Sequence, residues 1–204
     1  EHGDYTGIVP KMIHNKAVNY SLAFLSNWTK HYHGEFLFLS GDDIQRDKVP
    51  EVGQLYIFQS ILLLIGVIYS IKYFNKNFAL IWLWIIVAPV ASALTFQSPH
   101  ALRAHNMVIP LTVISALGMV KIVKLLNGFV KTRYLLIFAN FLLLVIVVWE
   151  FARYEHEYWK HMSKEYPYSS QYGVKELVNY IVGIKNNYKR VIVTNRYDQP
   201  YILF

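Results

Sequence analysis

Two cationic side chains, His100 and Arg103, stand three residues apart in the polar string SPHALRAHN of residues 98–106. A serine followed by a proline is typical of a helix start, with Ser98 as the N-cap and Pro99 at the first helical position. His100 and Arg103 would then share one face of the first turn, where backbone N–H groups are unpaired and the helix dipole is positive. This arrangement predicts a site for an anion, above all for a phosphate.

Arg103 also has a plainer interpretation. An arginine at a lipid interface is often an anchor whose charged end reaches the headgroups. An arginine binds phosphate through two parallel hydrogen bonds, however, which a lysine cannot do. The combination of cap, proline, histidine and arginine in a loop with little other charge favours the phosphate site over the anchor.

A second polar group precedes the first long apolar run. Asp42, Asp43 and Arg46 follow Gly41, and paired aspartates after a glycine are common in turns. One interpretation is a binding site for a substrate, an acceptor or a sugar, in which Asp42 and Arg46 take part with or without a metal. The other is a turn whose charges are solvated. His31 and His33 are only two potential metal ligands, so the sequence assigns no metal site.

The elements that must position these residues are apolar helices. The chain is 54% hydrophobic and 16% charged, whereas an ordinary soluble domain carries about 25% charged residues. No Asp, Glu, Lys, Arg or His occurs in four blocks, 55–71, 78–96, 107–120 and 134–149. A membrane span requires about 20 residues, and the third block reaches about 33 Å if its helix begins at Pro99. We therefore predict an α-helical integral membrane protein with about four transmembrane helices, the second one kinked at Pro89.

The loops differ in charge. The loop between the first and second blocks carries Lys72 and Lys76, and the loop between the second and third carries only Arg103. The loop between the third and fourth blocks carries four basic residues: Lys121, Lys124, Lys131 and Arg133. The positive-inside rule then places the lysine-rich loops in the cytoplasm and the Arg103 loop outside.

The chain divides into three parts. Residues 1–54 form an outward-facing segment with an amphipathic helix over 14–30, which lies either on the membrane surface or in the core of a small lobe. Residues 55–151 form the transmembrane region. In residues 152–204, a helix over 174–184 and a strand over 191–194 predict an outward-facing, truncated α/β lobe.

Four runs of the sequence resemble a known family. They are FLFLSGDDIQRDKVPEVGQLYIF, SPHALRAHNMVIP, QYGVKELVNYI and YKRVIVTNRYDQPYILF. Together they are similar to the C-terminal half of bacterial membrane glycosyltransferases that resemble the dolichyl-phosphate-mannose-protein mannosyltransferases, glycosyltransferase family 39 and the lipid A aminoarabinose transferases. The resemblance spans most of residues 30–204.

The resemblance implies a GT-C class enzyme of the cell membrane. Such an enzyme moves a sugar from a polyprenyl-phosphate donor to a protein, lipid or glycan acceptor on the outer face. His100 and Arg103 would contact the donor phosphate. The acidic catalytic residue of the family lies in an outward loop that would precede Glu1, so we expect a piece of a longer enzyme that is inactive by itself. The resemblance requires no cofactor, and it leaves open whether a divalent metal ion takes part.

Two other functions are left open by the sequence. A transporter module would be expected to carry ionisable residues within its spans, and the four blocks have none. A membrane-anchored binding or sensor protein would use its C-terminal lobe. Nucleic acid is excluded as a partner, because no nucleic-acid-binding motif accompanies the net charge of +7.

Overall fold

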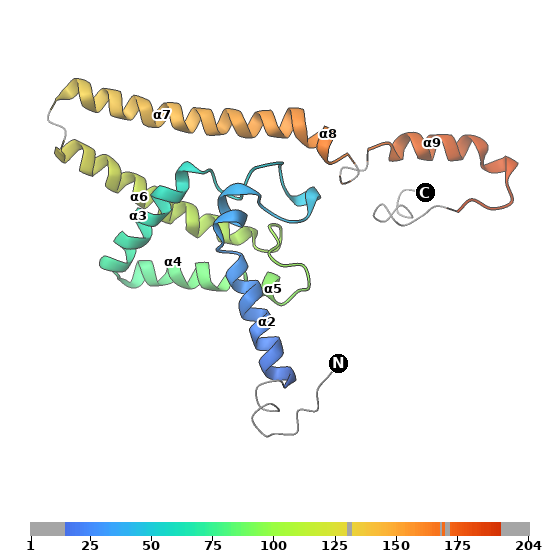
Figure 1. The fold of residues 1–204 in the computed structure, drawn as a ribbon, viewed down its shortest axis with the longest axis horizontal. Helices are drawn as coiled ribbons and strands as arrows, with labels where there is room; N and C mark the ends of the chain where they lie inside the picture. Colours follow the sequence, from blue (N-terminus) through green and yellow to red (C-terminus); the bar gives the residue numbers. More distant parts are fainter. Residues whose placement is uncertain (1–14, 130–131, 168, 170–171, 193–204) are drawn as a thin grey trace, which may run out of the picture.

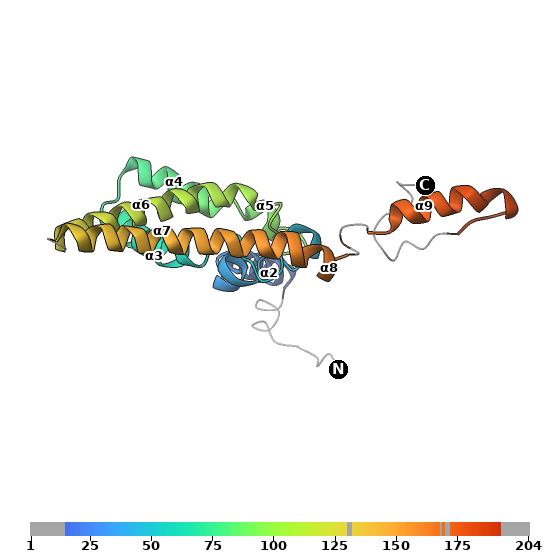
Figure 2. The same cartoon turned by 90° about the horizontal axis from the view of Figure 1, so that it is seen from above.

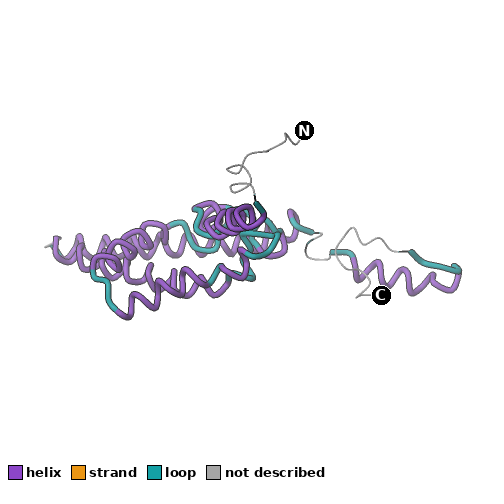
Figure 3. The backbone as a smooth tube through the Cα atoms, turned by 90° about the horizontal axis from the view of Figure 1, so that it is seen from below, coloured by secondary structure: helices purple, strands orange, loops and turns teal. Residues whose placement is uncertain are grey.

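The computed structural model describes residues 15–129, 132–167, 169 and 172–192, and these residues form helices and loops without a strand (Figures 1 and 3). Three helical stretches are long and apolar enough to cross a membrane: Lys76–Ala93, His105–Gly128 and Arg133–Glu165. The prediction of an α-helical membrane protein is confirmed to that extent.

The first predicted span is shorter than expected. Helix α3, Phe58–Lys72, has 15 residues, which correspond to about 22 Å and fall below the length that a span requires. Before it lie helix α2, Lys16–Lys30, a π-helical turn η1, Glu35–Leu39, and a 3-10 turn η2, Gln45–Asp47. The predicted amphipathic helix is α2, and its N-cap Asn15 accepts a hydrogen bond from the N–H of Val18 at 2.9 Å.

The second predicted span is interrupted at Pro89, as expected. Helix α4, Lys76–Val87, ends before the proline, and the short helix α5, Val90–Ala93, begins after it. Proline has no N–H and cannot donate to the carbonyl four residues earlier, so the helix breaks there.

The third helix does not begin at Pro99. Residues 99–104 form turns, η3 covers His105–Met107, and helix α6 covers Val108–Phe129. Pro110 therefore lies in the first turn of α6, where the missing N–H would have had no helical partner.

Helix α7, Arg133–His156, continues as η4, Glu157–Met162, and α8, Ser163–Glu165, along the long axis of the molecule (Figures 1 and 2). Helix α9, Val174–Ile184, confirms the predicted helix and ends in η5, Lys185–Asn187. It lies beyond α8, away from the other helices (Figures 1 and 2).

The predicted α/β lobe is not seen. Residues 191 and 192 belong to no strand, and 193–194 lie outside the described residues. Four consecutive β-branched residues favour a strand locally, but a strand needs a partner to pair with. The described part of the chain supplies none.

Helices α3 and α6 cross in close contact at two glycines. A Cβ atom added to Gly66 would clash with the carbonyl oxygen of Ile114, and one added to Gly118 would clash with that of Leu62. Small residues that let helix backbones approach are typical of helix contacts in membranes. At one end of this pair, an apolar core joins the helices to residues 36–55: Phe36, Leu37, Leu55, Ile85, Met107, Leu111 and Ile114.

Helix α7 is different, because no residue of its most apolar stretch is buried. Large apolar side chains on it are half or more exposed: Leu135, Ile137, Phe138, Phe141, Leu142 and Leu144. Such a contiguous apolar surface requires a lipid or protein partner rather than water. The helix is therefore suited to a bilayer.

The glycine contact gives a direct test. Gly66→Ala and Gly118→Ala should each lower the stability of the protein by about 1–3 kcal/mol, because the added methyl group meets a backbone carbonyl that cannot move freely. Thermal unfolding in detergent micelles measures this change. Gly128→Ala is the matched control in α6, since nothing lies within 4 Å of its added Cβ. It should be neutral or stabilising by about 0.5–1 kcal/mol; equal losses in all three variants would contradict the close contact.

Candidate functional site

Residues from two distant parts of the chain meet beside the N-terminal end of α6. We call this group the polar cluster; its members are His31, Asp42, Asp47, Ser92 and His100. All except Asp47 are buried, and the side chain of Asp47 is only 11% exposed. The motifs around residue 42 and residue 100, which the sequence pointed to separately, are therefore parts of one site.

Asp42 is the most enclosed charge of the cluster, with no exposed surface. Its Oδ1 accepts a hydrogen bond from the N–H of Ile44 at 2.9 Å. Its Oδ2 accepts one from the N–H of Ala101, 59 residues away. A buried carboxylate that accepts backbone hydrogen bonds holds the donating segments in place, so Asp42 fixes the 99–104 turns against the segment that precedes α3.

His31 has a defined tautomer, because each ring nitrogen has a different kind of partner. Its Nδ1 donates to the carbonyl oxygen of Asn27 at 2.9 Å. Its Nε2 accepts hydrogen bonds from the hydroxyl of Ser92 at 2.8 Å and from the N–H of His100 at 3.3 Å. Burial lowers the pKa of His31, which agrees with a neutral imidazole in this arrangement.

These contacts correct the helix start that was predicted at Ser98 and Pro99. Ser98 is not an N-cap, because no helix begins at Pro99 and the Ser98 hydroxyl donates to the carbonyl of Asn27 at 3.2 Å. The N–H groups of His100 and Ala101, expected to be unpaired, donate to His31 and Asp42. The anion found at the N–H of Ala101 is the carboxylate of Asp42.

His100 and Arg103 do not share a face. His100 is 4% exposed, and its Nδ1 lies 3.4 Å from Oδ2 of Asp42 and 3.7 Å from Oδ2 of Asp47. Arg103 is exposed, and its Nη1 donates to the hydroxyl of Thr95 at 2.8 Å. Of the two residues predicted to bind phosphate, only Arg103 presents its side chain at the surface.

The second predicted pair is also split. Asp42 belongs to the buried cluster, so the interpretation of a fully solvated turn is wrong for it. Arg46 is exposed, with its Nε 3.7 Å from Oδ1 of Asp47. Sequence reasoning missed Asp47, although the Asx turn at Asp42 and the 3-10 turn over 45–47 bring it back toward His100. No local pattern in the sequence pointed to Asp47, because its proximity to His100 arises from the fold.

Two aromatic side chains join this region to the break at Pro89. The hydroxyl of Tyr32 donates to the carbonyl of Ile85 at 2.8 Å, and the indole N–H of Trp28 donates to that of Ile86 at 2.9 Å. In an uninterrupted helix, the carbonyl oxygen of Ile85 would accept a hydrogen bond from the N–H of residue 89, which a proline lacks. Burial raises the pKa of Tyr32 to about 12, so it keeps its donor proton.

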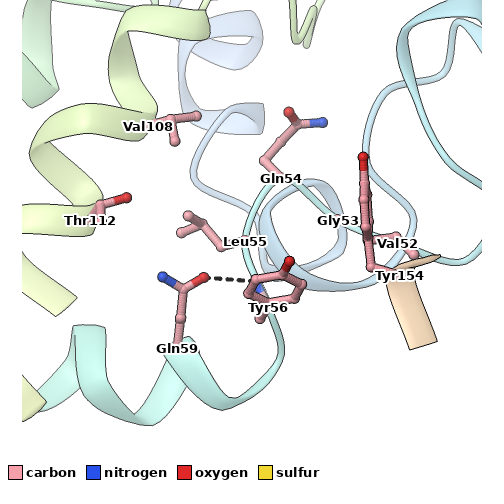
Figure 4. A pocket seen from close by; sticks show the side chains of 9 residues that line it. All are labelled: Val52, Gly53, Gln54, Leu55, Tyr56, Gln59, Val108, Thr112 and Tyr154. Atoms are coloured by element: carbon pink, nitrogen blue, oxygen red, sulfur yellow. Dashed lines mark hydrogen bonds between the residues drawn. The ribbon is translucent and has the colours of Figure 1, made fainter. Parts of the chain in front are cut away.

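A groove runs beside the cluster, between the segment before α3 and helix α7. Its apolar part is a pocket of about 360 Å³ (Figure 4). This part is lined by Val52, Gly53, Gln54, Leu55, Tyr56, Gln59, Val108, Thr112 and Tyr154. An adjoining pocket of about 380 Å³ shares Val52, Gly53, Gln54 and Tyr154 and extends to Arg46, Asp47, Lys48 and Tyr158. The groove therefore passes from an apolar end to a charged end.

Arg153 holds α7 at this groove. Its Nη1 donates to the carbonyl of Glu51 at 3.0 Å, and its Nη2 lies 3.3 Å from the carboxylate of Glu150. Next to it, the rings of Tyr154 and Tyr56 meet edge to face with centroids 6.4 Å apart. These contacts set the width of the groove at its polar rim.

The role of Asp42 as a structural anion is testable. Asp42→Asn replaces one acceptor oxygen by an NH₂ group that faces a backbone N–H, so about 1–3 kcal/mol of stability should be lost. Thermal unfolding in detergent measures the loss, and cleavage of the 99–104 turns by added protease should become faster. Asp43→Asn removes the same charge from the exposed neighbouring residue and should leave both properties unchanged. Equal behaviour of the two variants would exclude this role.

Comparison with known proteins gives no family for this chain. No protein-family model, no curated protein and no solved structure matches it. The function is therefore argued from the polar cluster, the groove and the apolar helices.

Proposed function

We propose that this chain is part of a membrane glycosyltransferase that takes a sugar from a polyprenyl-phosphate donor. The resemblance of the motifs around residues 42 and 100 suggests the enzyme class. The observation that carries the proposal is the groove beside the polar cluster, which joins an apolar end near α6 to a charged end at Arg46, Asp47 and Lys48.

The groove matches the chemistry of such a donor. A lipid-linked sugar phosphate combines an apolar chain, an anionic phosphate and a sugar rich in hydroxyl groups. Val52, Leu55 and Val108 offer an apolar surface for the chain. Arg46 and Lys48 offer positive charge for the phosphate, and the rings of Tyr154 and Tyr158 offer flat faces for the sugar.

The transfer step breaks the bond between the sugar C1 and the phosphate oxygen, and the electron pair leaves with the phosphate. A new bond forms between C1 and the acceptor oxygen, whose proton goes to a base. Negative charge on the leaving phosphate grows in the transition state, so a cation placed there lowers the barrier more than it strengthens ground-state binding. Our candidates for that cation are Arg46, which lines the charged end of the groove, and Arg103, which the resemblance implies and which does not line it. The resemblance assigns the base to a segment preceding residue 1.

The location follows from the same argument. We place the groove, the polar cluster and the 99–104 turns on the outer side of the cell membrane, because the short loops at the opposite ends of the helices are more basic than the loop that carries Arg103. Those loops carry Lys72, Lys76, Lys121, Lys124, Lys131 and Arg133. The acceptor, a protein, a lipid or a glycan, would approach from that side.

Arg103 provides the first test. In membranes containing the complete gene product, Arg103→Ala should reduce the rate of sugar transfer from a polyprenyl-phosphate donor at least tenfold. The loss of one hydrogen-bond donor to the transition state can raise the barrier by up to about 3–4 kcal/mol. Arg103→Lys should recover only part of the activity, because lysine lacks the planar fork of donors. Arg133→Ala, at the start of α7, is the charge-matched control and should keep full activity. Unchanged transfer by Arg103→Ala would remove this residue from the mechanism.

The groove provides the second test. Thr112→Trp adds bulk to its apolar end and should raise the KM for the lipid-linked donor about tenfold, which equals about 1.4 kcal/mol of lost binding. The expected change in kcat is small, because the reacting atoms would lie at the charged end. Val113→Trp places the same ring on an exposed neighbouring position that does not line the groove. If both variants behave alike, the donor chain does not occupy this pocket.

A further inference from the structure

We propose that Asp42, Asp47 and His100 bind a divalent transition-metal ion. The three ligand atoms would be Oδ2 of Asp42, Oδ2 of Asp47 and Nδ1 of His100. This site goes beyond the proposed transferase function and does not rest on it, because it follows from the positions of these three side chains alone.

The spacing of the three atoms suits a metal. They all lie within 4.8 Å of one another, and Nδ1 of His100 is 3.4 Å and 3.7 Å from the two carboxylate oxygens. Zinc binds imidazole nitrogen and carboxylate oxygen at about 2.0–2.2 Å, so two ligands of a tetrahedral ion are separated by about 3.4 Å. The two separations that involve His100, 3.4 Å and 3.7 Å, are close to this value.

Two of the three atoms lack a hydrogen bond although they are buried. These are Nδ1 of His100 and Oδ2 of Asp47. Buried polar atoms are nearly always paired, and an unpaired one costs about 1–3 kcal/mol. Nδ1 of His100 lies 3.4 Å and 3.7 Å from the two carboxylate oxygens and makes a hydrogen bond to neither. A single cation would satisfy the three atoms together.

The ligands are held in place by other contacts. The carboxylate of Asp42 is fixed by the N–H groups of Ile44 and Ala101, and the backbone of His100 is fixed by His31. Arg46 lies beside the other oxygen of Asp47, with 3.7 Å between Nε and Oδ1. Such outer contacts orient the ligands of protein metal sites.

The ligand set favours one class of ion. One imidazole with two carboxylates suits Zn²⁺, Mn²⁺, Co²⁺ or Fe²⁺, whereas Ca²⁺ and Mg²⁺ prefer oxygen ligands alone. Three protein ligands leave a coordination position for water or for an oxygen of a bound molecule. Asp47 also lines the charged end of the groove, so the ion would lie at its border.

The experiment uses the full chain, purified in detergent and stripped with a chelator. Co²⁺ serves as the probe, because a tetrahedral site gives visible absorption, and Zn²⁺ is added in competition. We expect one Co²⁺ per chain, displaced by Zn²⁺, and an unfolding temperature that rises with Zn²⁺ and returns to its initial value with EDTA. Asp47→Asn and His100→Gln should each weaken Co²⁺ binding at least tenfold.

Matched controls separate this site from general attraction of cations. Asp43→Asn and His105→Gln change exposed residues of the same two segments and should keep the affinity of the wild type. Absence of the visible absorption, or equal weakening by Asp43→Asn and Asp47→Asn, would overturn the proposal. Because Oδ2 of Asp47 makes no hydrogen bond that could be lost, the metal-free Asp47→Asn variant should unfold at a temperature no lower than that of the metal-free wild type. If either variant fails to fold, the Zn²⁺ and EDTA response of the wild type decides the question: no rise in its unfolding temperature refutes the site.

Discussion

The buried carboxylate of Asp42 is the constraint on which the rest of the site depends. A charge with no exposed surface is stable inside a protein only where donors surround it. Its two donors are backbone N–H groups from distant parts of the chain: that of Ile44 belongs to the same turn, and that of Ala101 belongs to the connection between α5 and α6. Satisfying this one charge therefore fixes the position of the connection between α5 and α6, with His100 buried and Arg103 exposed.

The helices supply a rigid base for that arrangement. The close contact of α3 and α6 at Gly66 and Gly118 leaves little freedom in their crossing, and the apolar core at one end of this pair carries the segment that contains Asp42. The break at Pro89 contributes in a different way, because the carbonyls that it frees accept hydrogen bonds from Tyr32 and Trp28. The break in the helix thus provides the acceptors that hold Tyr32 and Trp28, and with them the segment that leads to Asp42.

Most helices were predictable, because an apolar run favours a helix, and a proline interrupts one, through the residues next to it in the sequence. The sequence predicted α2, α6, α7 and α9 and the break in the second apolar block, and it pointed to residues 42 and 100. The start of α6 was mispredicted since the N–H groups of residues 100 and 101 have distant partners, His31 and Asp42. The strand expected at 191–194 required a neighbour that a local pattern cannot specify. Asp47 was missed for the same reason, because its proximity to His100 arises from the fold.

The contacts of the polar cluster also dictate an order of events during synthesis. Tyr32 is separated from its acceptor by 53 residues, Asp42 from Ala101 by 59 and His31 from His100 by 69. The whole of α3 and α4 lies between these partners. The N-terminal segment therefore cannot complete the polar cluster until α3, α4 and residue 101 have been synthesised. A change that displaces α3 or α4 would thus be felt in the polar cluster, because these helices join its two halves along the chain.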